Sequence, residues 1–247
     1  MCRFALVHSP ASILISVATR KEVELWLSQR AEVKQLSPHV VQFEVQNKQV
    51  YVVFTGVGMM HSAMHTALCI QQHKPDCVLH TGIAGCFDPN IPLGTLVRVL
   101  GDGCPDMGAV TPTGFMGMHE LGLVDSLLLP YGVHGLPADA SWPRWACVSA
   151  LPSGPGITVT ASSGSREQIA ETVQRTSFLY SERPLVETME GAGCQLAAQW
   201  FNLPYLHVRA ISNYVEPRNR KNWNIALALE SLSCFLHLAL ADWTAES

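Results

Sequence analysis

The chain has 247 residues, of which 48% are apolar and 15% charged. A chain of that length and apolar content buries a large core without disulfide or metal staples, and its low charge excludes an intrinsically disordered protein. Lysine and arginine total 16 and aspartate and glutamate total 20, so the net charge of −4 gives little attraction for nucleic acid.

Membrane insertion and export are not indicated either. The longest apolar runs, such as residues 235–240, are far below the ~20 residues that a membrane span requires. The first residues lack the pattern of an export signal, and the eight cysteines show no CxxC pair and no metal-ligand spacing. We therefore expect a cytoplasmic protein whose cysteines are mostly buried, reduced thiols.

Strand and helix patterns alternate along the chain. Short β-branched runs bounded by Gly, Pro or Asn predict strands at residues 13–17, 40–45, 50–55, 77–81, 95–100, 157–160 and 205–211. Helical patterns fall at residues 21–29, 59–72, 166–175, 191–201 and 222–241. The alternation predicts an α/β fold with a mostly parallel sheet and helices on both faces. Ligands in such sheets sit at the carboxyl ends of the strands.

The segment 102–145 differs from the rest, because it is rich in Gly, Pro, Met and His. Loops of that length are usually lids, binding loops or interface segments, so we expect an insertion and not a second domain.

Two glycine-rich turns follow predicted strands, at residues 55–58 (TGVG) and 81–85 (TGIAG). Glycine lets backbone N–H groups approach a ligand, although the run 55–58 is equally consistent with a tight structural turn. Two such runs at strand ends together favour a shared pocket more than either run does alone. The dinucleotide fingerprint fails because its third glycine position holds His61, and neither run has the lysine of a triphosphate-binding loop.

Two further patterns favour structural explanations. His61 and His65 lie one helical turn apart, but without an intervening glutamate or a third ligand they are more typical of a helix face than of a metal site. Ser163 lacks the GxSxG context of a nucleophile. Ser165 and Gln168 instead have the spacing of a helix N-terminal cap.

Carboxylates and one amide are the strongest candidates for chemistry. Glu187 and Glu190 stand beside a run of small apolar residues that opens a helix, where the helix dipole alone also explains an acidic first turn. Glu22 follows the first predicted strand and, by itself, is consistent with a solvated helix start. Asn213 ends the last strand, where an amide can both donate to and accept from a heterocycle or simply form a turn.

These pieces in this order resemble the purine nucleoside phosphorylase and methylthioadenosine nucleosidase superfamily. The matching runs are ILISVATRKEV at 13–23, TGVG at 55–58, KPD at 74–76, TGIAG at 81–85, MEGA at 189–192 and VRAIS at 208–212. The run ISNYVEPRNR at 211–220, with GDG at 101–103 and HELGL at 119–123, is similar to the futalosine hydrolase family within it.

The resemblance implies one α/β domain over residues 13–247, a twisted mixed sheet in three α/β/α layers, and an extension at residues 1–12. It implies no metal or organic cofactor, a nucleoside substrate and a homodimer or larger assembly, in which a neighbouring loop near Phe115 closes the pocket. The catalytic residues it implies are Glu22 and Asn213, and the substrate-binding residues are Gly58, Ile83, Ala84, Gly85, Thr160, Met189, Glu190 and Ser212.

Those roles define an expected reaction, the release of hypoxanthine from futalosine by water, in menaquinone biosynthesis. Glu22 matches the carboxylate that activates the water, while Met189 and Glu190 match the ribose clamp. Asn213 stands where adenine-releasing relatives have Asp, which favours a 6-oxopurine leaving group. The alternatives are a 6-oxopurine nucleoside phosphorylase, a methylthioadenosine or aminofutalosine nucleosidase that releases adenine, and a silent nucleoside-binding or storage protein.

Overall fold

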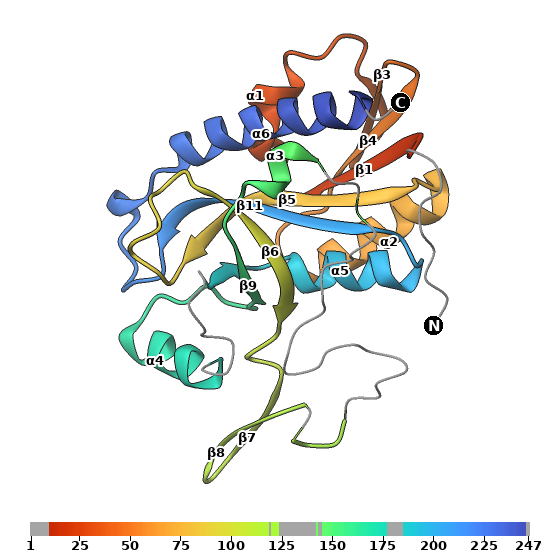
Figure 1. Cartoon of the computed structure of the whole chain (residues 1–247). Helices are drawn as coiled ribbons and strands as arrows, with labels where there is room; N and C mark the ends of the chain where they lie inside the picture. Colours follow the sequence, from red (N-terminus) through yellow and green to blue (C-terminus); the bar gives the residue numbers. More distant parts are fainter. Residues whose placement is uncertain (1–9, 119, 124–141, 143–144, 177–184, 246–247) are drawn as a thin grey trace.

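The computed structural model describes residues 10–118, 120–123, 142, 145–176 and 185–245. Within them a nine-stranded sheet has the order β10-β9-β6-β11-β5-β1-β4-β3-β2, and β7 and β8 form a separate hairpin (Figure 1). The strands are β1 (Ser12–Val17), β2 (Lys34–Ser37), β3 (Val40–Val45), β4 (Lys48–Phe54), β5 (Cys77–Cys86), β6 (Leu96–Gly103), β7 (Gly108–Thr111), β8 (Gly114–Gly117), β9 (Ser153–Thr158), β10 (Val186–Thr188) and β11 (Tyr205–Tyr214).

The sheet is mixed. Its centre is parallel, because β1 pairs in parallel with β4 and β5, and β5 pairs in parallel with β11. The β2–β3–β4 edge and the β6–β11 pair are antiparallel. The strand β10 pairs with both β9 and the far half of β5, so the sheet curls back on itself there. The mixed sheet implied by the resemblance is confirmed, and parallel pairings outnumber antiparallel ones within the described part of this sheet, as strand–helix alternation predicted.

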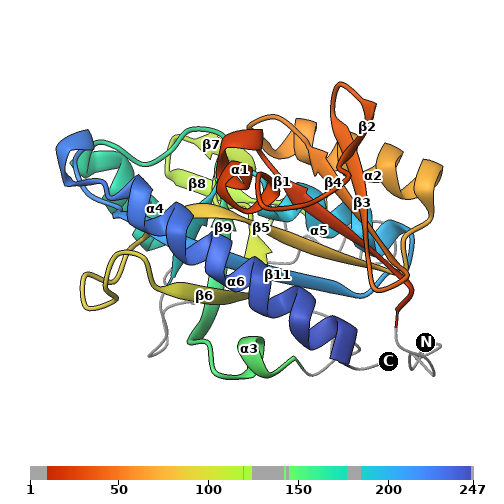
Figure 2. The ribbon, with the colours of Figure 1, turned by 90° about the horizontal axis from the view of Figure 1, so that it is seen from above.

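Helices cover both faces of this sheet. They are the short 3₁₀ turns η1 (Arg20–Glu22) and η3 (Arg220–Asn222), and the α-helices α1 (Glu24–Leu27), α2 (Met59–His73), α3 (Ala146–Ser149), α4 (Arg166–Arg175), α5 (Gly191–Trp200) and α6 (Ile225–Ala245). Figures 1 and 2 place α2 and α5 on one face and α6, α1 and α3 on the other. The two largest clusters of buried hydrophobic residues follow that division, one around Trp26, Phe235 and Trp243 and one around Cys69, Ile70 and Tyr205.

The helix α6 combines membrane-like composition with a core position. It is the one helix of the described chain that is long and apolar enough to cross a membrane, although polar residues interrupt its apolar runs. Its residues Leu232, Phe235 and Trp243 are nevertheless buried in the larger core against the sheet. The exposure of the other face, with Leu227 and Leu238 partly in solvent, is typical of a core helix of a globular domain.

Most predicted elements are confirmed to within a few residues, and the helix at 166–175 and the strand at 40–45 match fully. The predicted helix at 21–29 is wrong in detail, because Val23 leaves helical geometry and separates η1 from α1. The strand β10 was missed since three residues carry no periodicity. The segment 102–145 begins inside β6 and contains the β7–β8 hairpin and, at its end, the residues before α3.

The cysteines of the described chain are free thiols. Cys69, Cys77, Cys86 and Cys194 are buried, as expected, whereas Cys234 is exposed on α6.

Candidate active site

Glu22 lies where β1 ends, at a carboxyl edge of the sheet that also contains the ends of β5 and β11. The Thr19 backbone N–H donates to its Oε2 at 2.8 Å, which closes the η1 turn. The Ile83 N–H, from the glycine-rich run 81–85, donates to its Oε1 at 3.1 Å. Two backbone donors on separate elements therefore fix a carboxylate that is only 9% exposed.

Gly82 makes this approach possible. A Cβ at this position would lie 2.5 Å from Glu22 Oε1 and 2.6 Å from Arg209 Nη1, and the backbone φ of +151° is one that side chains rarely adopt. The run 81–85 therefore uses glycine for close packing of a carboxylate and a guanidinium against the strand.

Glu190 occupies the N-cap position of α5, and its side chain joins the first glycine-rich turn to the same edge. Its Oε1 accepts from the Gly58 N–H at 3.1 Å, across 132 residues of chain. Its Oε2 lies 3.6 Å from Arg209 Nη2 in an ion pair that is almost fully buried. Met189 beside it packs against the small apolar cluster of Ile157 and Val159.

Arg209 is the residue that sequence reasoning missed, although it stands in the quoted run 208–212. It is fully buried on β11, its Nε donates to His207 Nε2 at 2.7 Å and its Nη1 donates to the Ile83 carbonyl at 3.3 Å. Its Nη2 contacts His80 Nε2. The signal in the sequence was an arginine inside an otherwise apolar strand, which requires buried partners.

The two histidines around Arg209 have matching arrangements. His207 Nδ1 lies 2.9 Å from Asp102 Oδ2, and His80 Nδ1 lies 3.0 Å from the Ser16 carbonyl. Both partners are acceptors, so each ring carries its proton on Nδ1 and accepts from Arg209 through Nε2. Burial lowers the pKa of both rings, against the opposing effect of Asp102 on His207. Both rings are therefore neutral and add no positive charge beside the Arg209 guanidinium.

Burial also raises the pKa of Glu22, because desolvation outweighs the stabilising charge of Arg209. Glu190 adds to the rise through its own negative charge. A carboxylate with a raised pKa is a stronger base than a solvated one. The arrangement can therefore activate a water molecule held at Glu22 while Arg209 keeps the two carboxylates close.

Asn213 lies at the bulge of β11, opposite Gly85 of β5. Its Nδ2 donates to the Tyr214 carbonyl at 3.0 Å, and its Oδ1 lies 2.8 Å from Ser212 Oγ. Ser212 Oγ is also 3.1 Å from the Ala84 carbonyl, so the end of β11 is tied to the run 81–85. The half-buried amide keeps one Nδ2 hydrogen that this contact does not use.

The hydrogen bonds of Thr160 connect it to Asp106 and not to the residues around Glu22. Its backbone N–H and Oγ1 both bind Asp106 Oδ2, at 2.7 and 2.6 Å, in an exposed position. A ligand-binding role for Thr160 therefore stays a prediction.

The helices α4 and α2 contain two further patterns of the sequence. Ser165 caps α4 by accepting from the Gln168 N–H at 3.1 Å, so the capping prediction is confirmed. The His61 and His65 rings stack with centroids 6.1 Å apart on α2. Within the described residues no group of three or more His, Cys, Asp or Glu side chains is placed to hold a metal ion.

Comparison with known proteins decides the family. The model of the phosphorylase superfamily matches residues 12–236. The chain belongs to the phosphorylase superfamily. A futalosine hydrolase of Streptomyces coelicolor is 34% identical over 185 residues, covering 72% of this chain and 73% of that protein. A 5'-methylthioadenosine/S-adenosylhomocysteine nucleosidase of Pseudoalteromonas translucida is 26% identical, covering 77% of each.

Solved structures of the superfamily share the fold. The native futalosine hydrolase of Helicobacter pylori superposes with a TM-score of 0.73 at 19% identity, covering 93% of this chain and 97% of that one. A nucleosidase of Neisseria meningitidis in complex with methylthio-immucillin-A gives 0.72 at 19% identity, covering 95% and 98%. The family and the fold class predicted from the sequence are therefore confirmed, whereas the roles of individual residues stay predictions.

Proposed function

We propose that the protein hydrolyses the N-ribosidic bond of futalosine, releasing hypoxanthine and dehypoxanthine futalosine in the futalosine route to menaquinone. The observation that carries the proposal is Asn213, placed opposite Gly85 at the strand edge that also holds Glu22. The similarity to a futalosine hydrolase supports it.

Glu22 is the proposed general base. Bonds from Thr19 and Ile83 hold its carboxylate, and burial raises its pKa, so it can take a proton from an attacking water. A base held within hydrogen-bond reach typically contributes about 10²–10⁴-fold to the rate.

Glu190 is the proposed ribose clamp. The Gly58 N–H fixes one oxygen, and a carboxylate at this place accepts from ribose hydroxyls and stabilises the positive charge that builds on the sugar ring. Met189 packs beside it and supplies an apolar contact for the sugar.

Asn213 is the proposed contact for the leaving group. Its Nδ2 can donate to O6 or N7 of a 6-oxopurine, while the backbone of Ile83, Ala84 and Gly85 lines the neighbouring edge. An aspartate here would instead suit a 6-amino group, as in the adenine-releasing alternative.

For the phosphorylase alternative, the candidate phosphate ligands are Arg20 and the run 82–84, and neither suits that role. Arg20 is exposed, and its Nε pairs with Glu24 Oε2 at 2.8 Å. The run 82–84 offers neither a hydroxyl nor a cation, and the Glu22 carboxylate repels an anion. A silent binding protein would not require the buried Glu22 and Glu190 pair.

The deciding experiment measures hypoxanthine release from futalosine in phosphate-free buffer and again with phosphate, with inosine and methylthioadenosine alongside. Release from futalosine alone, indifferent to phosphate, is expected. Release from inosine only with phosphate would establish a phosphorylase and contradict the proposal.

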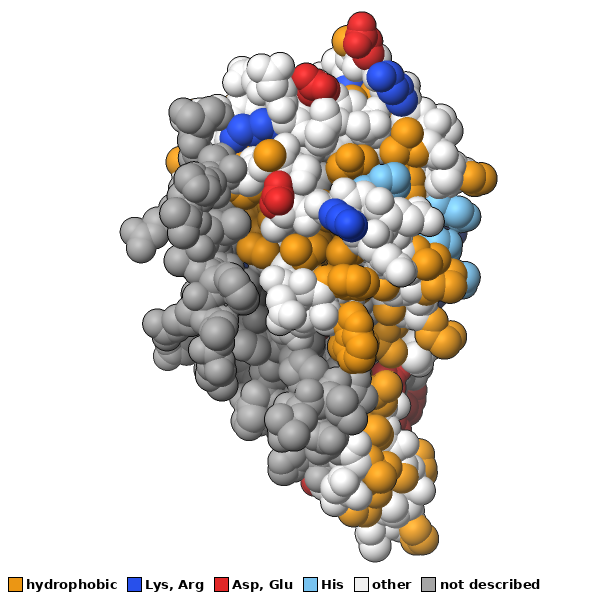
Figure 3. Space-filling model, turned by 90° about the vertical axis from the view of Figure 1, so that its right-hand side faces the viewer, with side chains coloured by type: hydrophobic (Ala, Val, Ile, Leu, Met, Phe, Trp, Pro, Cys, Tyr) orange, Lys and Arg blue, Asp and Glu red, His pale blue; other side chains and the backbone are white. Residues whose placement is uncertain are grey.

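We also propose a cytoplasmic homodimer. Met60, Met64 and Leu68 lie four residues apart on α2, and all three are exposed, Met60 at 83%. Figure 3 shows hydrophobic side chains gathered on this side of the molecule, with histidines at one edge. A continuous apolar stripe of this kind is typical of an interface.

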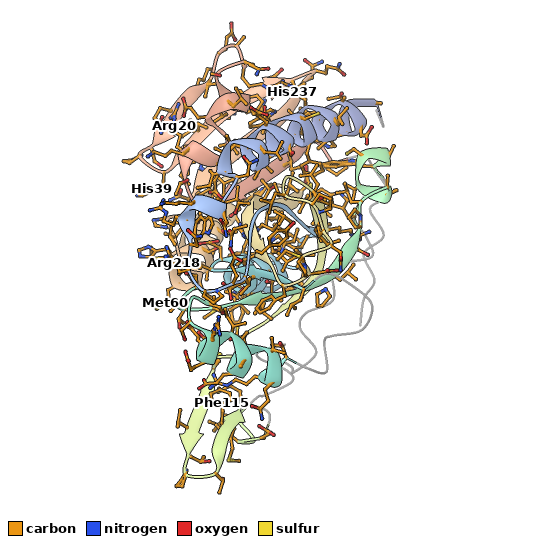
Figure 4. The ribbon with its side chains drawn as sticks, turned by 90° about the vertical axis from the view of Figure 1, so that its left-hand side faces the viewer. Arg20, His39, Met60, Phe115, Arg218 and His237 are labelled. Atoms are coloured by element: carbon orange, nitrogen blue, oxygen red, sulfur yellow. The ribbon has the colours of Figure 1, made fainter. Side chains whose placement is uncertain are left out.

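The β7–β8 hairpin, which contains Phe115, lies at the opposite end of the molecule from Arg20 (Figure 4). That position suits the proposal that the loop near Phe115 closes a neighbouring subunit's pocket. We likewise propose that the predicted range 13–247 forms one domain with 102–145 as an insertion, since β5 pairs with strands from both halves of the chain. The predicted extension 1–12 overlaps this domain, because Ser12 is the first residue of β1 and pairs with Gln49.

The dimer is tested with the double variant Met60→Glu and Met64→Glu by sedimentation velocity. We expect dissociation to monomers, because two charges per subunit would be buried in the interface. The matched control is Leu238→Glu on the exposed side of α6, which should stay dimeric. A double variant that sediments as the wild type does would exclude α2 as the interface.

A further inference from the structure

Glu187 is a buried carboxylate that the proposed mechanism does not use. It lies in the middle of β10 and is 7% exposed. Its Oε1 accepts from the Ser163 N–H at 3.0 Å. Within the described residues its Oε2 is buried without any hydrogen-bond partner. Buried polar atoms are rarely left in that state, so this oxygen calls for a partner such as a water, an ion or a ligand.

The sheet register places Glu187 beside the proposed purine contact. Gly85 pairs with Glu187 of β10 on one side and with Asn213 of β11 on the other. Residues paired directly across strands share a face of the sheet, so both side chains flank the bare backbone of Gly85. With neighbouring strands about 4.8 Å apart, their Cα atoms are separated by about 10 Å.

The absence of a side chain at Gly85 makes room for the Asn213 amide. A Cβ there would lie 3.2 Å from Asn213 Nδ2 and 3.0 Å from Val215 Cγ2, so any side chain would displace the amide. The Asn213 amide thus lies over Gly85, while Glu187 is paired with the same glycine from the strand on its other side.

An N–H donor suits Oε2 in the ionised form of Glu187. Burial raises the pKa of Glu187, and the negative charge of Asp106 raises it further, against the bonds from Ser163. A ligand N–H bound at Oε2 would stabilise the ionised form, which burial disfavours.

We propose that Glu187 is a specificity-determining residue that accepts the N1–H of a 6-oxopurine base while Asn213 donates to O6 or N7. The inference rests on the proposed function for the identity of the base. A 6-oxopurine carries a proton on N1, whereas N1 of a 6-aminopurine is an acceptor that a carboxylate repels. Glu187 therefore distinguishes 6-oxopurines from 6-aminopurines at N1, and Asn213 distinguishes them at O6 or N7.

A purely structural role makes a different prediction. If Glu187 only closes the loop at Ser163, glutamine serves as well, because its Oε1 also accepts from the Ser163 N–H. In the proposed role glutamine fails, because the Oε1 remains with Ser163 and the amide NH₂ then meets the N1–H as a second donor.

The test is binding of free bases to the whole protein by calorimetry. Wild type should bind hypoxanthine about 10²-fold tighter than 1-deazahypoxanthine, which has a C–H in place of the N1–H. Glu187→Gln should lose that preference and gain affinity for adenine, since its amide can donate to N1. The matched control is Glu167→Gln, an exposed glutamate of α4, which should behave as the wild type.

Two outcomes would overturn the inference: equal binding of the two bases by the wild type, or an unchanged preference in Glu187→Gln. If that variant fails to fold, the wild-type comparison still decides. Futalosine turnover by the wild type is measured separately. Its absence would refute the proposed function, whereas the base-binding result judges Glu187 alone.

Discussion

The two ends of the candidate site differ in how their polar groups are satisfied. At the proposed ribose end, backbone N–H groups hold Glu22 and Glu190, and Arg209 pairs with Glu190. At the proposed base end, Asn213 is half-buried with an unused hydrogen and Glu187 keeps a buried oxygen without a partner. The ribose end is preorganised for the reaction, whereas the base end leaves hydrogen-bonding capacity for the ligand to complete, which is where specificity can be altered at least cost to the fold.

The largest expected effect breaks the ribose end. Glu22→Gln keeps the size of the side chain and removes the base, so futalosine hydrolysis should fall by about 10²–10⁴-fold while substrate binding is largely retained. Single-turnover rates and equilibrium binding of a substrate analogue measure the two quantities. Normal turnover would remove Glu22 from water activation.

The next largest effect tests the positive charge of Arg209 at the proposed ribose end. Arg209→Lys keeps a cation but cannot contact His207, Ile83 and Glu190 at once, so we expect kcat/KM to fall by about 10²-fold. The acidic limb of the rate profile should move to higher pH, because Arg209 opposes the rise in the pKa of Glu22.

The pH profile separates this role from simple loss of packing. The exposed Arg166→Lys serves as the control and should leave both rate and profile unchanged. A profile of Arg209→Lys that lies on that of the wild type would contradict the electrostatic role.

A smaller effect sharpens the base end. Asn213→Asp replaces the amide donor with an acceptor, so the preference should shift toward 6-aminopurine substrates by about 10-fold or more. The ratio of kcat/KM for futalosine and its 6-amino analogue reports the shift. An unchanged ratio would refute the argument for a 6-oxopurine leaving group.

The smallest expected effect is on how the free energy of unfolding depends on pH, compared between the ribose end and the base end. Burial raises the pKa values of Glu22 and Glu187, so the folded protein holds protons that the unfolded chain releases near the ordinary pKa of 4.5. The free energy of unfolding therefore falls as pH rises from the ordinary to the raised pKa. Glu22→Gln and Glu187→Gln should each reduce that fall, measured by urea unfolding at pH 8 relative to pH 4.

An exposed carboxylate provides the comparison for both variants. Glu230→Gln on α6 should follow the wild-type pH dependence. If the buried and exposed variants respond alike, desolvation of Glu22 and Glu187 is not the cause.

The sequence predicted the elements whose residues carry their own pattern. The helix α4 begins where Ser165 and Gln168 form a cap, and β3 follows a β-branched run with clear boundaries. The strand β10 and the break at Val23 carry no such local signal, because pairing with β9 and β5 and the Glu22 turn impose them. Local propensity was therefore sufficient for long elements and failed for short ones.

The amino-acid sequence by itself determined the α/β class, the family and the residue types available for chemistry at Glu22, Glu190 and Asn213. Only the tertiary structure decided that Arg209 lies between neutral histidines and that Glu187 flanks Gly85 opposite Asn213. The reason is that motifs record neighbours along the chain, whereas desolvation, charge pairing and unsatisfied hydrogen bonds depend on neighbours across strands.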